Sequence, residues 1–132
     1  MPIYSEVLNV PANTSEDSPV SLDIKIKQRY ISHMEIGFPD GCNYKVKVRI
    51  QYGIKVFWPE RVGTWIIGNN ETIRWDERFT MPSINETLTV YGISPEATYD
   101  HDVVIRIMTL PKGFYFLETL LNRLYNIFKK IF

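Results

Sequence analysis

The chain has 132 residues, of which 45% are hydrophobic and 14% aromatic, and its 15 basic and 15 acidic side chains cancel to a net charge of zero. This length suits one domain with a single core, and this apolar content excludes a disordered chain. A neutral chain lacks the basic surface that nonspecific nucleic-acid binding requires, so we expect no specific nucleic-acid partner.

Cysteine content and the N-terminal residues bear on where the chain resides. Cys42 is the single cysteine, which excludes an intrachain disulfide. The first residues lack the basic region and apolar run of a signal peptide, which predicts a chain kept in a cytosol or released from one by lysis. Three Asn-x-Thr/Ser triplets, at Asn13, Asn70 and Asn85, are interpreted as turns rather than as glycan sites.

The N-terminal third predicts two strands separated by a polar loop. Residues 3–10 alternate weakly, and Glu6 interrupts their apolar face, so we expect an edge strand or a contact arm. Residues 11–19 are polar and contain two prolines, which is typical of a loop. Residues 20–27 alternate cleanly and predict the second strand.

Residues 30–59 show the strongest strand pattern in the chain. Segments 30–38 and 44–52 are predicted to form a hairpin, because residues 39–41 (Pro-Asp-Gly) have the chemistry of a turn. The second arm alternates strictly, which indicates one buried and one wet face. Its predicted buried face consists of Tyr44, Val46, Val48, Ile50 and Tyr52. A short third arm at residues 54–59 completes a predicted β-meander.

The remaining strand patterns lie between residues 64 and 110. Segments 64–67, 71–79, 86–92 and 101–110 are predicted strands, and the last one is apolar on both faces, as in a central strand. Short strands at this even spacing predict an all-β fold. We expect an antiparallel β-sandwich or jelly roll of about eight strands over residues 1–113.

Residues 114–132 predict a C-terminal amphipathic α-helix, which forms the second unit of the chain. Its apolar seam has residues 4, 3, 4 and 3 positions apart, which is a heptad spacing. The seam is Leu117, Leu121, Leu124, Phe128 and Ile131, widened by Leu120 and Ile127 on one side and by Tyr125 and Phe132 on the other. An isolated helix of this length is marginal in water, so we predict that these nine residues form an interaction surface. Three covers stay open: the chain's own sandwich, copies or a neighbouring protein, and a membrane interface.

Nothing in the sequence predicts a catalytic residue, a metal site or a cofactor. His101 lies between two aspartates, but neighbours in a strand point to opposite faces, so we interpret it as a hydrogen-bonded side chain at a strand entry. His33 is interpreted as a solvated partner of Glu35. Cys42 is interpreted as a core or turn thiol, because no base is placed beside it.

Two further groups of residues have a binding and a structural interpretation. The aromatic group could stack on sugars as an exposed row, but we expect core packing. It consists of Tyr52, Trp58, Trp65, Trp75 and Tyr91. The positive stripe Lys45, Lys47 and Arg49 could contact phosphate, but we interpret it as solvation and edge protection of a strand.

A pattern over residues 20–110 resembles small β-sandwich virion proteins of tailed bacteriophages, which build the head or tail. The matching features are Ile31-x-His33-x-Glu35-Ile36-x-Phe38-Pro39-x-Gly41-Cys42, the alternating strand after it, Trp58-Pro59, Gly68-Asn69-Asn70-Glu71 and Tyr99-Asp100-His101. The resemblance implies a capsid-surface, head-completion or tail-associated protein that acts through oligomeric contacts. The helix after Pro111 has no counterpart in this pattern.

The leading hypothesis is therefore a non-enzymatic virion structural or assembly protein, made in the host cytoplasm and located in the virion. Its expected partners are copies of itself, other virion proteins or both, with the C-terminal helix as the anchor. The alternatives are a carbohydrate-binding or adhesion module with a glycan ligand, and a peripheral membrane protein that contacts the bilayer through the helix.

Overall fold

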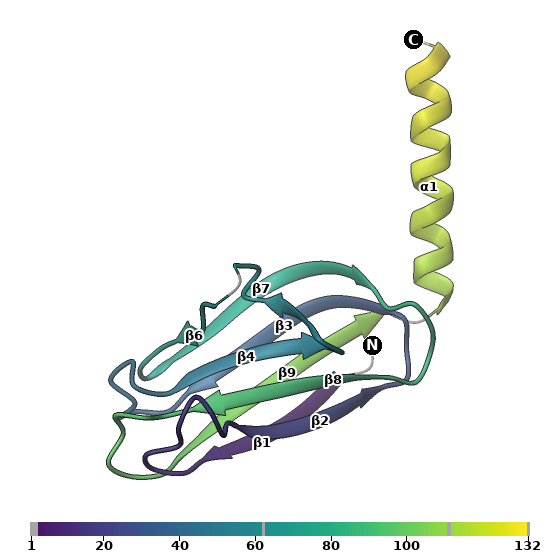
Figure 1. Ribbon diagram of the computed structural model, residues 1–132. Coiled ribbons are helices and arrows are strands. Elements are labelled where there is room, and N and C mark those ends of the chain that lie inside the picture. Colours follow the sequence, from purple (N-terminus) through teal and green to yellow (C-terminus); the bar gives the residue numbers. More distant parts are fainter. Residues whose placement is uncertain (1–2, 62, 111, 132) are drawn as a thin grey trace.

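The computed structural model describes residues 3–61, 63–110 and 112–131, without the side chains of residues 56, 57 and 112–118. Over these residues the chain forms nine strands and one helix. Figure 1 shows two sheets packed face to face, with the helix rising from one end. The predicted antiparallel β-sandwich with a C-terminal helix is confirmed.

The sandwich consists of a four-stranded and a five-stranded sheet, and every pairing described is antiparallel. The four-stranded sheet has the order β1 (Ile3–Val10), β9 (His101–Leu110), β3 (Tyr30–Phe38) and β7 (Glu71–Thr80). The five-stranded sheet has the order β2 (Val20–Ile26), β8 (Glu86–Ile93), β4 (Lys47–Tyr52) and β5 (Lys55–Trp58), and β6 (Ile66–Ile67) also pairs with β4. As predicted, β1 lies at a sheet edge and β9 between two neighbours.

The core lies between the sheets and is built from the alternating apolar residues of both. Met34 and Ile36 of β3 point inward from one sheet, and Val48 and Ile50 of β4 from the other, all without solvent exposure. The period of two places each strand's apolar set on the inner face and its polar set outside.

The predicted hairpin between residues 30–38 and 44–52 is wrong. Strand β3 pairs with β7 and β9, whereas β4 pairs with β5, β6 and β8, so the two arms lie in opposite sheets. Alternation states which face of a strand is buried but not which strand pairs with it. The predicted hairpin between the second arm and the short third arm does form, as β4 and β5.

The connection between β3 and β4 is longer than the predicted turn. Gly41 has a φ of 92°, as its turn chemistry predicts, but Asn43 and Tyr44 also adopt positive φ values. Tyr44 is consequently 56% exposed instead of opening the buried face of the strand, and β4 begins at Lys47.

Helix α1 spans Lys112–Ile131, so it begins before the predicted start at residue 114. Gly113 is therefore part of the helix instead of preceding it. Glycine can adopt the helical conformation, although it costs about 0.5–1 kcal/mol of backbone entropy relative to alanine.

Candidate functional site

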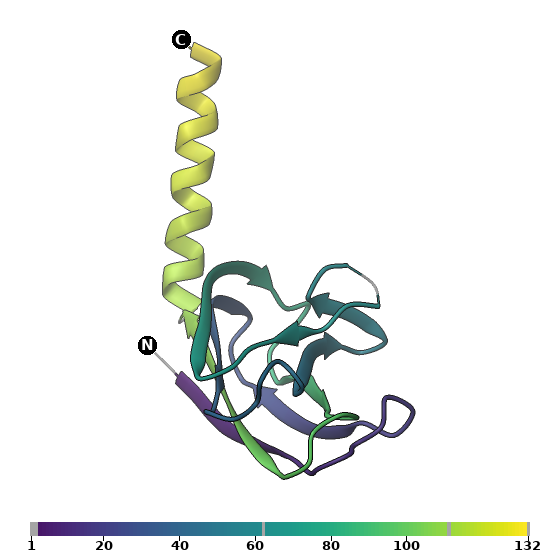
Figure 2. The ribbon, with the colours of Figure 1, turned by 90° about the vertical axis from the view of Figure 1, so that its left-hand side faces the viewer.

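Helix α1 stands away from the sandwich. Its base lies beside the end of β9, and from there it extends outward instead of folding over a sheet (Figure 1). Figure 2 shows that it leaves on the side of the four-stranded sheet. The five-stranded sheet therefore keeps an outer face that α1 does not cover.

The apolar face of α1 is open to solvent over the described part of the helix. Its large apolar side chains are between 42% and 66% exposed. They are Leu120, Leu121, Leu124, Tyr125, Ile127, Phe128 and Ile131. Of the other two predicted interaction residues, the Leu117 side chain and the whole of Phe132 lie outside the described residues.

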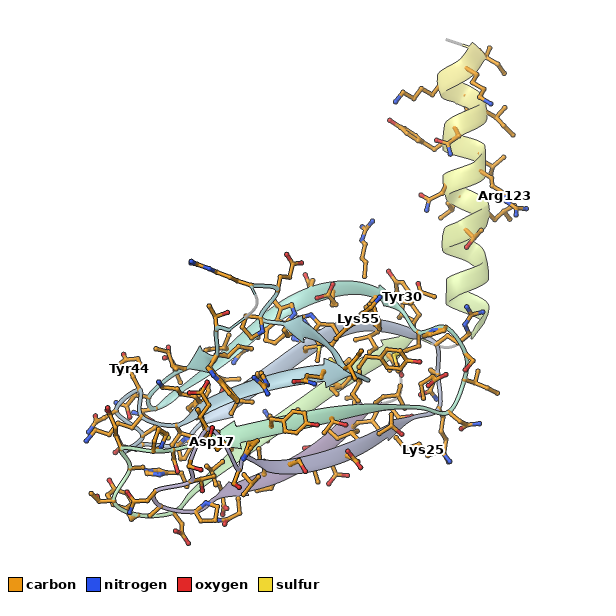
Figure 3. All side chains as sticks on the ribbon, in the orientation of Figure 1. Asp17, Lys25, Tyr30, Tyr44, Lys55 and Arg123 are labelled. Carbon is orange, nitrogen blue, oxygen red and sulfur yellow. The ribbon has the colours of Figure 1, made fainter. Side chains whose placement is uncertain are left out.

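The opposite face of α1 is polar and basic. Arg123, Lys129 and Lys130 are exposed on it, and Figure 3 shows side chains standing out from the helix on all sides. The two lysines occupy the last turn, where positive charge is favourable to the helix dipole. These charges lie off the heptad seam.

Within the described residues, no helix is both long enough and apolar enough to cross a membrane, and this includes α1.

His33 belongs to a polar network on the outer face of the four-stranded sheet. Its Nδ1 lies 2.9 Å from Asp76 Oδ1 and its Nε2 lies 3.4 Å from Glu35 Oε2. Arg106 Nη1 lies 3.8 Å from the same Glu35 carboxylate. The predicted pair with Glu35 is confirmed, but it is not fully solvated, because the His33 and Glu35 side chains are only 23% and 12% exposed. Asp76 joins the pair because β7 is the neighbour of β3. Among the described residues, no group of three His, Cys, Asp or Glu side chains has the arrangement of a metal site.

His101 and Cys42 are both buried. Neither ring nitrogen of His101 has a hydrogen-bond partner among the described residues, so the predicted hydrogen-bonded histidine is wrong. Its ring packs instead against Tyr99, with 4.7 Å between the ring centroids. Burial, helped by the nearby Asp40 carboxylate, raises the pKa of the Cys42 thiol, which keeps it protonated and a poor nucleophile. The interpretation of Cys42 as a core thiol is confirmed.

The tryptophans do not line up as an exposed row. Trp58 is buried, and its indole N–H donates to the Glu77 carboxylate. Trp75 is half-buried and donates to the same carboxylate over 3.2 Å. Core packing is therefore the role of these two rings.

Trp65 and Tyr91 behave differently because they flank Arg49 on the outer face of the five-stranded sheet. The Arg49 guanidinium carbon lies 4.2 Å from the Trp65 ring centroid and 5.4 Å from that of Tyr91. The positive stripe of Lys45, Lys47 and Arg49 was interpreted as solvation and edge protection. Edge protection is wrong, because β4 has paired neighbours on both sides. Sequence reasoning missed this cluster, since Arg49 and Tyr91 meet only through the pairing of β4 with β8.

Comparisons with known proteins find similarity in three-dimensional structure alone. Neither a protein family model nor a curated protein matches the chain. A chain from the structure of tomato aspermy virus matches with a TM-score of 0.41 and 12% identity, covering 83% of this chain and 79% of its own.

Two further solved structures match at the same level. The mitogen derived from Yersinia pseudotuberculosis has a TM-score of 0.40 and 7% identity, covering 84% of this chain and 87% of its own. A structure of Bacillus endospore appendages, a family of disulfide-linked pili, has a TM-score of 0.40 and 14% identity, covering 83% of this chain and 88% of its own. Scores this low carry no argument about function.

Proposed function

We propose that this protein is a non-enzymatic structural component of a virion, and that copies of it assemble through α1. The observation that carries the proposal is the exposed apolar face of a helix that stands clear of its own sandwich. The capsid-surface, head-completion and tail-associated locations all fit a protein of this kind, in agreement with the sequence resemblance stated above.

The energetics of α1 require a cover for this face. A helix of 20 residues is marginal in water without tertiary packing. Seven apolar side chains about half exposed offer roughly 1 kcal/mol each on burial, or about 7 kcal/mol per helix. This gain is comparable to the cost of association, so a single contact is weak and many linked copies supply avidity.

The shape of the face favours copies of α1 as the cover. A heptad seam packs against an equivalent seam, and residues on both of its sides widen it beyond what a two-helix contact buries. A bundle of several helices buries a face of this width. The basic residues point away from such a bundle core and stay in solvent.

Substitutions on the two faces of α1 test the proposal. Replacing Leu121, Leu124 and Phe128 with serine removes three seam residues, and we expect a shift from oligomer to monomer in analytical ultracentrifugation. The matched control replaces Asn122 and Asn126 with serine on the polar face and should leave the oligomer intact.

Removal of residues 114–132 should give a folded monomeric sandwich. A native protein that sediments as a monomer at high micromolar concentration contradicts the proposal.

Peripheral membrane binding is the second candidate, and the three cations on the polar face of α1 favour it. An amphipathic helix with a basic polar face lies flat on an anionic bilayer. Flotation with phosphatidylserine-containing vesicles separates the two functions. The membrane function is established instead if the native protein is monomeric in solution and floats with these vesicles, and if removal of residues 114–132 abolishes the flotation.

A further inference from the structure

The outer face of the five-stranded sheet carries a half-buried arginine without a counter-ion. Arg49 makes no ion pair with any described residue, and its Nε atom is buried without a hydrogen-bond partner. A guanidinium is charged at every physiological pH, and partial burial makes an unpaired charge costly. An oxyanion from outside the chain would offset the cost of the charge by binding the Nη end of the guanidinium, which is not among the buried unpartnered atoms.

The two rings beside Arg49 fix its orientation. Trp65 and Tyr91 lie within cation–π distance of the guanidinium carbon, at 4.2 and 5.4 Å from their centroids. A stacked guanidinium presents its N–H edge in a fixed direction, which suits bidentate binding of a carboxylate. We call Arg49, Trp65 and Tyr91 the Arg49 site.

The charges around the Arg49 site favour an anion. Lys47 lies two residues earlier on the same face of β4, and Lys25 lies on the same outer face of β2. The one carboxylate placed on this face by the register, Asp23, accepts a hydrogen bond from Thr89 Oγ1 over 2.9 Å. The site is therefore positive without being a long basic track, which selects a ligand with one anionic group and argues against a nucleic acid.

Hydroxyl groups surround the charged centre. Strand register places Ser21, Tyr91 and Arg49 in one row across β2, β8 and β4, and Thr89 lies in the next row. These groups donate and accept hydrogen bonds, as sugar hydroxyls require, while Trp65 and Tyr91 are aromatic rings near the surface. The helix leaves from the opposite side of the sandwich, so α1 does not obstruct this face (Figure 2).

We propose that the Arg49 site binds an acidic saccharide, with the sugar carboxylate on the Arg49 guanidinium. The carboxylate accepts from the N–H edge of Arg49, and the sugar hydroxyls bond the flanking Ser21 and Thr89. This site is independent of the assembly role of α1, because it lies on a different element and a different face.

Titration of the full-length protein with defined sugars tests the site by ¹H–¹⁵N NMR and calorimetry. The probes are trigalacturonate, a glucuronate-containing hyaluronan oligosaccharide and 3′-sialyllactose, compared with methyl-esterified trigalacturonate and inorganic phosphate. We expect saturable binding of at least one acidic sugar, with shifts at residues 49, 65 and 91. No saturable binding of any acidic sugar overturns the proposal. Equal affinity for the ester, or for phosphate, overturns it as well.

Matched arginine variants test whether Arg49 carries the binding. Arg49→Lys keeps the charge but loses the planar stacked fork, and we expect about tenfold weaker binding or more. Arg74→Lys makes the same change on the outer face of the other sheet and should leave the affinity unchanged. An Arg49→Lys protein that keeps its native NMR spectrum and binds the sugar as tightly as the native chain contradicts the assignment.

Discussion

At the residue scale, the start of β8 is held by two hydrogen bonds to one carboxylate. Glu86 accepts from the Ser83 hydroxyl and from the Tyr52 hydroxyl, which lower the pKa of Glu86 in that order of importance. The same contact with Glu86, together with some burial, raises the pKa of Tyr52. This cluster ties the end of β4 to the loop that precedes β8.

The two pKa shifts predict how stability depends on pH. The Glu86 contribution is complete above the ordinary value of 4.5 and is lost as pH falls through the lower pKa of the folded state. The Tyr52 contribution is complete below the ordinary value of 10.0 and is lost as pH rises through its raised pKa. We therefore expect a stability plateau between these values in urea unfolding, with a loss on each side.

Single substitutions separate the two sides of this profile. Ser83→Ala should weaken the acid loss and leave the alkaline loss intact, whereas Tyr52→Phe should weaken both. Some alkaline loss remains in Tyr52→Phe, because the Cys42 thiol also has a raised pKa. Tyr44→Phe, at an exposed position in the connection between β3 and β4, serves as the control and should change neither side. An unaltered alkaline loss in Tyr52→Phe would show that the Glu86 contact does not act.

Residue chemistry predicted some local conformations and missed others. Asn13, Asn70 and Asn85 were interpreted as turn residues, and each adopts a positive φ. Asparagine tolerates this conformation because its short side chain can hydrogen-bond locally. Tyr44 also adopts a positive φ, but its type gives no sign of that, and its place in an alternating pattern predicted the opposite.

At the element scale, the packing of β1 against β8 uses a position that only glycine fits. Gly92 lies on the inner side of β8, and β1 of the other sheet approaches it closely. A Cβ atom added there would lie 2.8 Å from Val10 Cγ2 and 2.9 Å from Leu8 Cδ2. These distances are shorter than packed side chains allow, so the side chains of β1 leave no room for a Cβ atom at this position.

Gly92→Ala should therefore destabilise the sandwich. We expect the free energy of unfolding to fall by about 1–3 kcal/mol, which is the usual cost of overpacking a core. Gly37→Ala is the matched control, because a Cβ on this β3 glycine would meet its nearest neighbours at an ordinary 3.6 Å. Urea unfolding of both variants gives the comparison, and equal effects would mean that β1 yields to the added methyl group.

The pairing of the elements was beyond the reach of the sequence pattern. Alternation located the core strands, because burial on one face imposes a period of two. Strands β3 and β4 have the same period and are consecutive, yet they face each other across the core. The Arg49 site was missed for the same reason, since its members come from β4, β8 and the segment before β6.

At the scale of the whole molecule, a sandwich carries a helix that touches it near the end of β9 and otherwise stands clear of it. The heptad seam predicted that α1 needs a cover, but the same seam also suits packing on the chain's own sheet. Whether α1 packs on its own sheet or extends away from it depends on the chain direction at the end of β9, which the sequence pattern does not encode. In the structure this direction leads α1 away from the sheets (Figure 1).

This arrangement predicts that dilution unfolds the helix and spares the sandwich. All three tryptophans, Trp58, Trp65 and Trp75, lie before β8, so their fluorescence reports on the sandwich alone. Far-ultraviolet circular dichroism reports on α1 as well. If copies of α1 cover each other, the helical signal should fall on dilution together with the oligomer mass, because the helix is marginal alone.

The tryptophan fluorescence should stay constant over the same dilution. Arg123→Gln, on the polar face of α1, should leave the dilution midpoint in place, whereas Leu124→Ser on the seam should move it to higher concentration. A helical signal that is independent of concentration in the native chain would show that α1 is stable without copies of itself. The exposed seam would then need a different cover, and this result would support the membrane function.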